Sequence, residues 1–237
     1  MQYSGGKAKQ AKKIAAVLSE HRKPGQPYLE PFCGAFSVGV LMDDPRCASD
    51  VDEDIVALLQ AVGQGWQPPD MVTEEQYDKW KEDPSQLLPA MRAFVGFGCS
   101  FGVVKWSRYA KGKQNYALSC RRTLLAVAER LSTVEFSVRS YEEWEPDGML
   151  VYCDPPYVNT STGVVHGTYH FNPYDFWDLI RDWSKHNDVF VTERMVPSSS
   201  VELVYEWNRS RENNGVNVSR SFIREALYRV LPSGIGI

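Results

Sequence analysis

The stretch "MLVYCDPPYVNT", residues 149–160, begins as an apolar strand and stops at two consecutive prolines. Residues 149–153 have the apolar and aromatic composition of a buried strand. The two prolines fix two φ angles and remove two N–H donors, so the loop is stiff and presents carbonyl oxygens. Asp154 adds a carboxylate, which only accepts hydrogen bonds, and Tyr157 adds a flat ring for stacking. This combination suits an –NH2 group on a planar base.

An ordinary Pro-Pro turn is the alternative interpretation of residues 154–157, and the chain offers a comparison. "WQPPDM", residues 66–71, also has two prolines, but no strand precedes them and no Asp-before, Tyr-after frame surrounds them. We interpret that second segment as a linker. The strand in front of residues 154–157 makes an ordinary turn a poor explanation there.

Helical and strand patterns alternate along most of the chain. Before residue 63 they predict a helix over about residues 7–21, a strand in 27–32, the start of a helix in 37–42, a strand in 46–52 and a helix over 55–62. After residue 130 they predict strands in 133–140, 148–153, 188–193, 201–207 and 224–231, and a helix with Phe176, Leu179, Ile180 and Trp183 on one face. Such alternation indicates an α/β fold with a mostly parallel sheet.

Residues 63–130 break this alternation. They have helical patches, a Gly- and aromatic-rich middle and no strand alternation, so we predict an inserted, mainly helical subdomain at 63–130. The catalytic domain would then consist of residues 1–62 and 131–237. Although the chain has a net charge of −4, the stretch 84–128 contains no Asp or Glu. It carries seven basic residues: Arg92, Lys105, Arg108, Lys111, Lys113, Arg121 and Arg122. That charge suits an acidic partner, but a small hydrophobic subdomain with a solvated basic face explains the composition equally well.

Composition excludes several classes of protein. With 43% hydrophobic and 12% aromatic residues the chain can bury a core, so it is not a disordered chain. No apolar stretch approaches the roughly 18 residues of a membrane helix, and the first residues lack a signal-peptide core. The five cysteines are scattered without a C-x-x-C pair, so we expect neither a metal site nor disulfides, and a cytoplasmic location. No obligatory protein partner is evident.

Two further loops carry candidate ligand-binding residues. Gly34 lies where a predicted strand turns into a helix, which lets a ligand approach the backbone, although a helix-packing turn is about as good an explanation. Asp50 follows the next predicted strand, where a carboxylate can accept hydrogen bonds from both ribose hydroxyls. Asp52 competes for that role, and a solvated acidic run is the alternative for both.

Four motifs in this order give the chain a family resemblance. "YSGGK" at 3–7, "EPFCG" at 30–34, "DVD" at 50–52 and "DPPY" at 154–157 together resemble the Dam-like family of DNA N6-adenine methyltransferases. The resemblance spans nearly the whole chain. It implies a Rossmann-like methyltransferase fold, S-adenosylmethionine as cofactor with S-adenosylhomocysteine as product, and double-stranded DNA as partner. The residues between the third and fourth motifs would form the target-recognition segment.

The resemblance also assigns roles to individual residues. It implies a catalytic role for Asp154, Pro155, Pro156 and Tyr157. It implies cofactor binding by Tyr3, Gly6, Lys7, Glu30, Pro31, Phe32, Cys33, Gly34, Asp50 and Asp154, with a phosphate as the other candidate partner of Lys7. In the insertion we expect DNA binding by Lys105, Arg108, Lys111, Lys113, Arg121 and Arg122.

The sequence departs from the family pattern in three places. Ala35 and Phe36 follow Gly34, where the family often has further glycines. Ser140 and Tyr141 follow the strand that often ends in an acidic residue near the cofactor's adenine, so that contact stays unassigned. The opening aromatic residue is Tyr3, where the family often has tryptophan.

Alternative functions remain open at this stage. An N4-cytosine, RNA-adenine or protein-glutamine methyltransferase could use a similar loop, and an inactive DNA-binding relative could keep the fold without transfer. Asp154 favours adenine, because cytosine enzymes more often have serine and glutamine enzymes asparagine at that position. The sequence therefore predicts a site-specific adenine-N6 methyltransferase acting on a flipped-out base.

Overall fold

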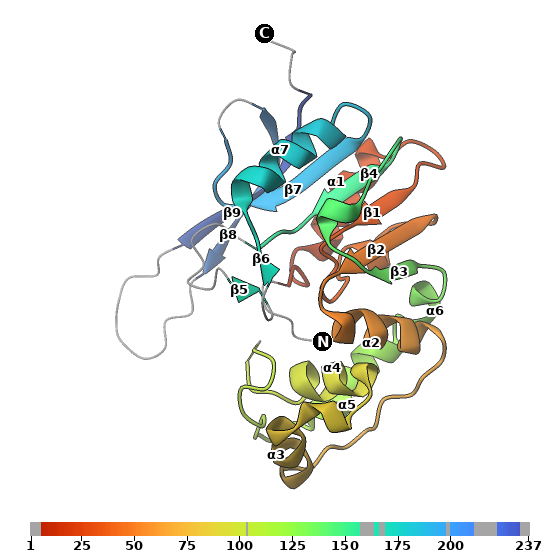
Figure 1. The fold of residues 1–237 in the computed structure, drawn as a ribbon, viewed down its shortest axis with the longest axis vertical. Coiled ribbons are helices and arrows are strands. Elements are labelled where there is room, and N and C mark those ends of the chain that lie inside the picture. The colour runs from red at the N-terminus through yellow and green to blue at the C-terminus, as the bar shows by residue number, and fades with distance from the viewer. Residues whose placement is uncertain are drawn as a thin grey trace.

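A seven-stranded sheet forms the centre of the computed structural model, which describes residues 6–102, 104–156, 164–165, 169–197, 200–210 and 222–232. Its strand order is β3-β2-β1-β4-β7-β9-β8 (Figure 1). The strands are β1 (Tyr28–Glu30), β2 (Arg46–Asp50), β3 (Glu135–Val138), β4 (Leu150–Cys153), β7 (Asp188–Glu193), β8 (Val201–Ser210) and β9 (Phe222–Val230). The first five in this order pair in parallel, and β9 is antiparallel to both β7 and β8. The predicted Rossmann-like α/β fold with a mostly parallel sheet is confirmed.

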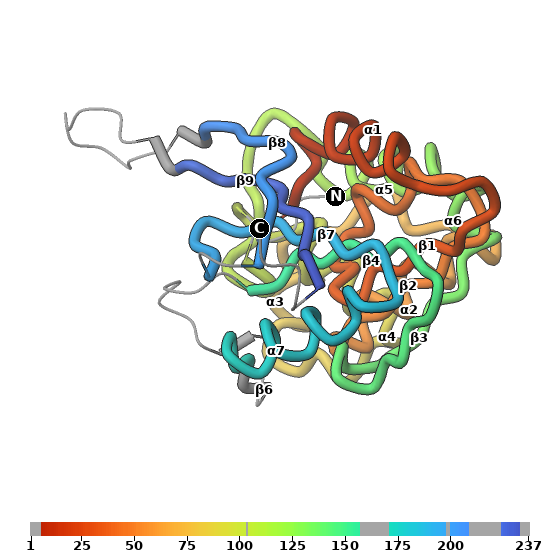
Figure 2. Tube along the Cα trace, turned by 90° about the horizontal axis from the view of Figure 1, so that it is seen from above, coloured from red at the N-terminus to blue at the C-terminus, as the bar shows by residue number. Residues whose placement is uncertain are grey.

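Helices cover both faces of this sheet. The helical elements are α1 (Ala11–His21), η1 (Gly39–Leu41), α2 (Glu53–Gly63), α3 (Glu74–Glu82), η2 (Pro84–Gln86), α4 (Pro89–Gly98), α5 (Tyr116–Leu125), α6 (Ala128–Leu131), η3 (Tyr141–Glu143) and α7 (Pro173–Trp183). One core cluster joins α1, η1 and α2 to the sheet, and a second joins α7 to the opposite face. Figure 2 shows α1 and α7 on opposite sides of the strands. A short antiparallel pair, β5 (Val164–Val165) and β6 (Tyr169–His170), precedes α7.

One predicted helix is wrong. Residues 37–42 form only the single 3-10 turn of η1. Phe36 adopts a φ of +52°, outside the helical region, and β2 begins at Arg46, so the chain has no room for a longer helix. Gly39 is required there, because a Cβ would lie 2.1 Å from the Phe36 ring. The predicted helix at 7–21 also begins later, at Ala11.

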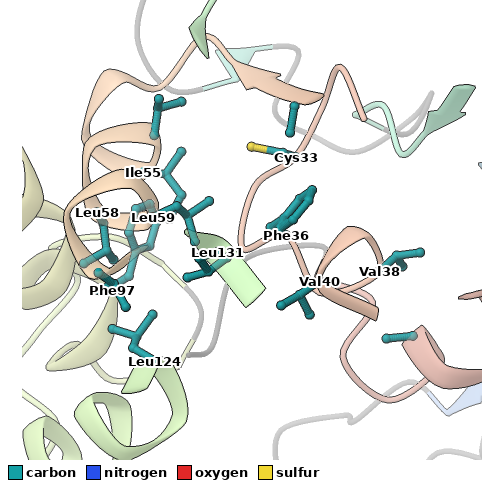
Figure 3. Close-up of a cluster of buried hydrophobic side chains, with 14 of the residues drawn as sticks. Cys33, Phe36, Val38, Val40, Ile55, Leu58, Leu59, Phe97, Leu124 and Leu131 are labelled. Carbon is teal, nitrogen blue, oxygen red and sulfur yellow. The ribbon is translucent and has the colours of Figure 1, made fainter. Parts of the chain in front are cut away.

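The insertion is mainly helical, as predicted, and shares its core with the rest of the chain. Its described residues form α3, η2, α4 and α5, with an isolated antiparallel bridge between Ser100 and Tyr109. One apolar cluster runs from the sheet through α2 into α4 and α5. Figure 3 shows Leu58 and Leu59 of α2 in the same cluster as Phe97 of α4 and Leu124 of α5. Whether the segment acts as a target-recognition unit stays a prediction.

The two ends of the insertion meet at the end of α2. A Cβ on Gly63 would lie 2.9 Å from the carbonyl carbon of Leu131 and 3.0 Å from its oxygen. Arg46 of β2 fastens the returning chain, because its guanidinium donates to Arg130 O at 2.7 Å and to Thr133 Oγ1 at 2.9 Å. The backbone thus leaves and re-enters the sheet-bearing part at one place.

We expect Gly63→Ala to lower the free energy of unfolding by about 1–3 kcal/mol through overpacking. At an uncrowded helix position the same change would raise the free energy of unfolding by roughly 0.5–1 kcal/mol. The sign of the measured change therefore tests the close approach of Gly63 to Leu131. Gly112→Ala is the control, because the nearest atom to its added Cβ would be Tyr116 Oη at 3.5 Å. Denaturant unfolding of the three proteins checks this. A Gly63→Ala variant at least as stable as the parent would contradict the close approach.

Candidate active site

The strand order reverses between β1 and β4, and the candidate site lies at the carboxyl ends of these strands. β1 and β4 are neighbours in the sheet. The strand that follows β1 in sequence, β2, pairs on the side of β1 away from β4, and β7 pairs on the side of β4 away from β1. In open α/β sheets a ligand binds in the crevice at such a reversal. Asp154 directly follows β4, and the loop from Pro31 to Gly34 directly follows β1. The motifs that are far apart in the sequence therefore meet at one edge of the sheet.

Asp154 is held by two side chains from elsewhere in the chain. Its Oδ1 accepts a hydrogen bond from Lys7 Nζ at 2.6 Å and from Thr192 Oγ1 at 2.7 Å. The Lys7 side chain is 5% exposed and that of Asp154 is 17% exposed, so the ion pair is largely shielded from water. Among the described residues no donor contacts Asp154 Oδ2. One carboxylate oxygen is thus engaged by the protein, and the other is left for a ligand.

Thr192 is the functional candidate that sequence reasoning missed. It lies near the end of β7, and the parallel register pairs Cys153 with Val191, which brings Thr192 beside Asp154. A register alignment of the strands "LVYC" and "DVFV" at their ends would have found it. Contact of Lys7 with the cofactor or a phosphate stays a prediction, and in the structure its ammonium forms an ion pair with Asp154.

The loop after β1 is tied to the end of β2. Cys33 N donates to Ser49 O at 2.9 Å, and Gly34 N donates to Asp50 Oδ2 at 2.9 Å. Gly34 has a φ of +43°, a conformation that side chains rarely adopt, so glycine permits this turn. Asp50 Oδ1 also accepts from Asp52 N at 3.0 Å. The structure thus brings together Gly34 and Asp50, the two loop residues singled out in the sequence.

The two candidate carboxylates at the end of β2 have different surroundings. Asp52 caps α2 by accepting from Asp54 N at 3.0 Å, and it forms an ion pair with Lys105 at 3.1 Å. Its side chain is 5% exposed. Asp50 is half-buried, and its carboxylate accepts from Gly34 N in the loop after β1, where a nucleoside would lie. Asp50 is therefore the better candidate for ribose.

Glu30, which was expected to bind the cofactor, forms hydrogen bonds with other residues of the protein. Its Oε2 accepts from Tyr28 Oη at 2.7 Å and from Gly39 N at 2.9 Å, in a fully buried position. Burial, together with the nearby charge of Asp154, raises the pKa of Glu30 to about 8. Glu30 is therefore mostly protonated at neutral pH. It supports the turn at η1, which fixes the far end of the loop after β1.

Phe32 belongs to an aromatic cluster under the loop. Its ring stacks on Tyr141 with a centroid distance of 4.9 Å and meets Phe171 and Phe176 edge-on. Ser140 caps η3, and its N–H donates to Glu143 Oε1 at 2.8 Å. These contacts give Ser140 and Tyr141 structural roles at the place where the family often has an acidic residue.

The remaining predicted site residues differ in how exposed they are. Pro155 is buried, Pro156 is half-buried and Gly6 is exposed. Tyr3 and Tyr157 lie outside the described residues. No group of three or more His, Cys, Asp or Glu side chains within the described ranges could hold a metal ion.

The six predicted DNA-binding residues divide into two groups. Lys105 pairs with Asp52 and Asp54 and so ties the insertion to the start of α2, whereas Arg121 donates to Pro68 O and Gln67 Oε1 within the insertion. The other four are exposed: Arg108, which stacks on the Phe101 ring at 4.1 Å, Lys111, which pairs with Glu74 at 2.7 Å, Lys113 and Arg122.

An adenosyl cofactor is compatible with these residues. The turn at Gly34 places its backbone N–H beside the Asp50 carboxylate, and Phe32 precedes Gly34 by two residues in the same loop. A carboxylate suits ribose hydroxyls, and an aromatic ring suits an adenine. We expect Gly34 and Asp50 to hold the nucleoside part.

Comparisons with known proteins match the first part of the chain to a methyltransferase family. The family model described as D12 class N6 adenine-specific DNA methyltransferase matches residues 3–87, a segment that includes Lys7, the loop after β1 and Asp50. No curated protein matches the chain. In the part of the chain that the structure describes, no helix is long and apolar enough to span a bilayer.

Solved methyltransferase structures resemble the chain only distantly. An rRNA methyltransferase from Streptomyces viridochromogenes is 14% identical, with a TM-score of 0.40 over 92% of this chain and 84% of that one. A magnesium protoporphyrin IX methyltransferase from Synechocystis, solved with its bound cofactor, is 9% identical, with a TM-score of 0.41 over 94% and 79%. A Thermoplasma acidophilum protein is 9% identical, with a TM-score of 0.47 over 93% and 86%. With these TM-scores below 0.5, the three likenesses carry no inference about substrate.

The family match covers Lys7, the loop after β1 and Asp50, which the strand order brings to one edge of the sheet. The chain is a methyltransferase of Rossmann-like fold whose cofactor is S-adenosylmethionine, and its residues 3–87 match the model of the D12 class N6 adenine-specific DNA methyltransferase family.

Proposed function

We propose that this protein is a site-specific DNA adenine-N6 methyltransferase that acts on a flipped-out base. The observation that carries the proposal is the placement of Asp154. Its carboxylate stands at the mouth of β4, with Oδ1 held by Lys7 and Thr192 and with Pro155 stiffening the backbone that follows. The match of residues 3–87 to an adenine-specific DNA family supports the choice of base.

Asp154 and Pro155 would act on the target amine. The exocyclic N6 of adenine is a weak nucleophile because its lone pair is delocalised into the ring. Hydrogen bonds from its two N–H groups to Asp154 Oδ2 and the Pro155 carbonyl would favour a pyramidal nitrogen and localise that lone pair. Bound S-adenosylmethionine supplies an electrophilic methyl group. The protein's contribution is thus orientation and fixed electrostatics, which supply most of the acceleration in such reactions.

The target base must leave the duplex to reach Asp154. A stacked adenine cannot enter a site at a sheet edge, and flipping costs a few kcal/mol. An aromatic residue after the prolines would recover roughly 1–3 kcal/mol by stacking. The proposal gives this role to Tyr157, which lies outside the described residues.

Tritiated S-adenosylmethionine incubated with adenine-rich duplex DNA, followed by nucleoside analysis, tests this function. We expect the label in N6-methyladenine. Label in N4-methylcytosine, or label transferred only to RNA or protein offered in parallel, would contradict the DNA-adenine assignment and leave the methyltransferase assignment intact.

The duplex would contact the exposed cations of the insertion. Lys113 and Arg122 are the best candidates for phosphate contacts, since they are exposed and, among the described residues, neither forms an ion pair. Replacing both with glutamine should lower the slope of log K against log salt by up to about 1.8, because each phosphate contact contributes about 0.9. Affinity should fall alike on cognate and scrambled duplexes, since phosphates carry no sequence information.

A charge-matched control lies on α7 and the turn after it, outside the insertion. Arg181 and Lys185 belong to α7 and the turn after it, and their replacement by glutamine removes the same charge. Salt titrations of DNA binding compare the two double variants. Equal slopes in both would show that Lys113 and Arg122 are solvated surface residues.

A further inference from the structure

A buried chain of hydroxyl groups leads to Asp154 beneath the site. Thr192 is 0% exposed, and its Oγ1 lies 2.7 Å from Asp154 Oδ1, 3.3 Å from Tyr152 Oη and 3.5 Å from Cys153 O. Tyr152 is equally buried. All four groups come from the adjacent strands β4 and β7 or the residue that follows β4. The position of Thr192 is therefore fixed by the sheet, not by a mobile loop.

The single hydroxyl proton of Thr192 can serve one acceptor. The carboxylate of Asp154 is nearer than Cys153 O and is the stronger acceptor when ionised, so Thr192 donates to Asp154 Oδ1. Thr192 Oγ1 then accepts from Tyr152 Oη. The Lys7 ammonium donates to the same Oδ1 from the N-terminal segment, at 2.6 Å.

Two donors on one oxygen restrict the rotation of the carboxylate. The terminal torsion of aspartate is broad and roughly two-fold, so an unrestrained carboxylate can exchange its two oxygens. In this site both donors reach Oδ1, and no donor among the described residues contacts Oδ2. Oδ2 is thus the oxygen that remains for the target.

We propose that Thr192 is a positioning residue for methyl transfer, which with Lys7 holds Asp154 Oδ1 so that Oδ2 is presented to the target amine. The inference rests on the proposed role of Asp154. Lys7 alone would supply charge, but a single hydrogen bond from a flexible side chain leaves the Asp154 carboxylate free to turn about that bond. The buried Thr192 hydroxyl donates a second hydrogen bond to Oδ1 from a rigid strand, and the two bonds together fix the orientation of the carboxylate.

The test uses Thr192→Val, which keeps the branched shape and removes the donor. We expect kcat to fall by about 10- to 100-fold, because small misplacements of a reacting group cost up to about that much. The KM for DNA and the Kd for S-adenosylmethionine should stay within about two-fold, since Thr192 would touch neither.

Two further variants separate positioning from packing. Thr192→Ser restores the donor and should restore kcat to near that of the parent. Tyr152→Phe removes the neighbouring hydroxyl but leaves the bond from Thr192 to Asp154, so its kcat should also stay near the parent value. A Thr192→Val enzyme with unchanged kcat, a Thr192→Ser enzyme as slow as Thr192→Val, or a Tyr152→Phe enzyme equally slow would each overturn the inference.

A measurement without turnover keeps this inference distinct from the proposed function. Crystal structures of the parent, Thr192→Val and Thr192→Ser show the orientation of the Asp154 carboxylate directly. We expect the carboxylate to be rotated, or to occupy two orientations, in Thr192→Val and to keep its parent orientation in Thr192→Ser. The same orientation in all three would overturn the inference, even if the enzyme methylates adenine. A chain that never methylates adenine but shows the rotation would contradict only the proposed function.

Discussion

Asp154→Ala is expected to abolish methyl transfer. The carboxylate would act on the target amine, and removing one such preorganised group typically lowers kcat by about 10²–10³-fold. Single-turnover assays with labelled S-adenosylmethionine measure the transfer step directly. Near-normal turnover would remove Asp154 from the catalytic assignment, and with it the central role of the loop after β4.

The structure shows that alanine at this position has a second effect. Lys7 is 5% exposed and would lose its anionic partner, and breaking a buried ion pair by removing one member costs about 3–5 kcal/mol of stability. Asp154→Asn is the sharper variant, because its amide oxygen can still accept from Lys7 and Thr192. Its –NH2 group would face the target where Oδ2 now stands. We expect a folded protein that binds the cofactor and transfers almost no methyl group.

Asp50→Ala has the second largest expected effect, on cofactor affinity. Ribose hydroxyls would lose a charged acceptor worth about 1.5–3 kcal/mol, which corresponds to a Kd roughly 10- to 150-fold higher. The loop after β1 would also lose the bond from Gly34 N to Asp50 Oδ2, so the turn that approaches the ligand would be less well fixed. Calorimetric titration with S-adenosylmethionine measures the affinity.

Asp52→Ala is the matched control for Asp50. Asp52 caps α2 and pairs with Lys105, so its loss should reduce stability by about 0.5–2 kcal/mol through the cap alone. Cofactor affinity should stay near that of the parent. If Asp52→Ala weakens cofactor binding more than Asp50→Ala, the ribose assignment belongs to the other carboxylate.

The strands of the sheet could be predicted from sequence because their patterns are local. Buried runs such as 150–153 and 188–193 can be recognised from composition, and so can the stretch 84–128 of the insertion, which has no Asp or Glu. The helix predicted at 37–42 failed because apolar residues at helical spacing also pack in a 3-10 turn. The positive φ of Phe36 and the early start of β2 prevent a longer helix in residues 37–42, and neither feature can be read from a hydrophobic pattern.

Parts of the site depend on pairing between distant residues, which composition does not reveal. The contact of Lys7 with Asp154 and that of Thr192 with Asp154 follow from strand order and register. Charge counting likewise could not separate Lys105, which binds two carboxylates within the protein, from Lys113, which is exposed. A basic stretch predicts that cations are present but not which of them already have partners.

The apolar cluster that continues from α2 into α4 and α5 limits how the insertion, the proposed target-recognition segment, can be exchanged between relatives. A graft of residues 63–130 alone would bring a foreign apolar surface onto Leu58 and Leu59 of α2. Such chimaeras should fold only when the α2 face is exchanged together with the insertion, or when the two surfaces match in volume. New specificities should therefore be sought first by changing exposed residues of the insertion, such as Arg108, which leave that interface intact.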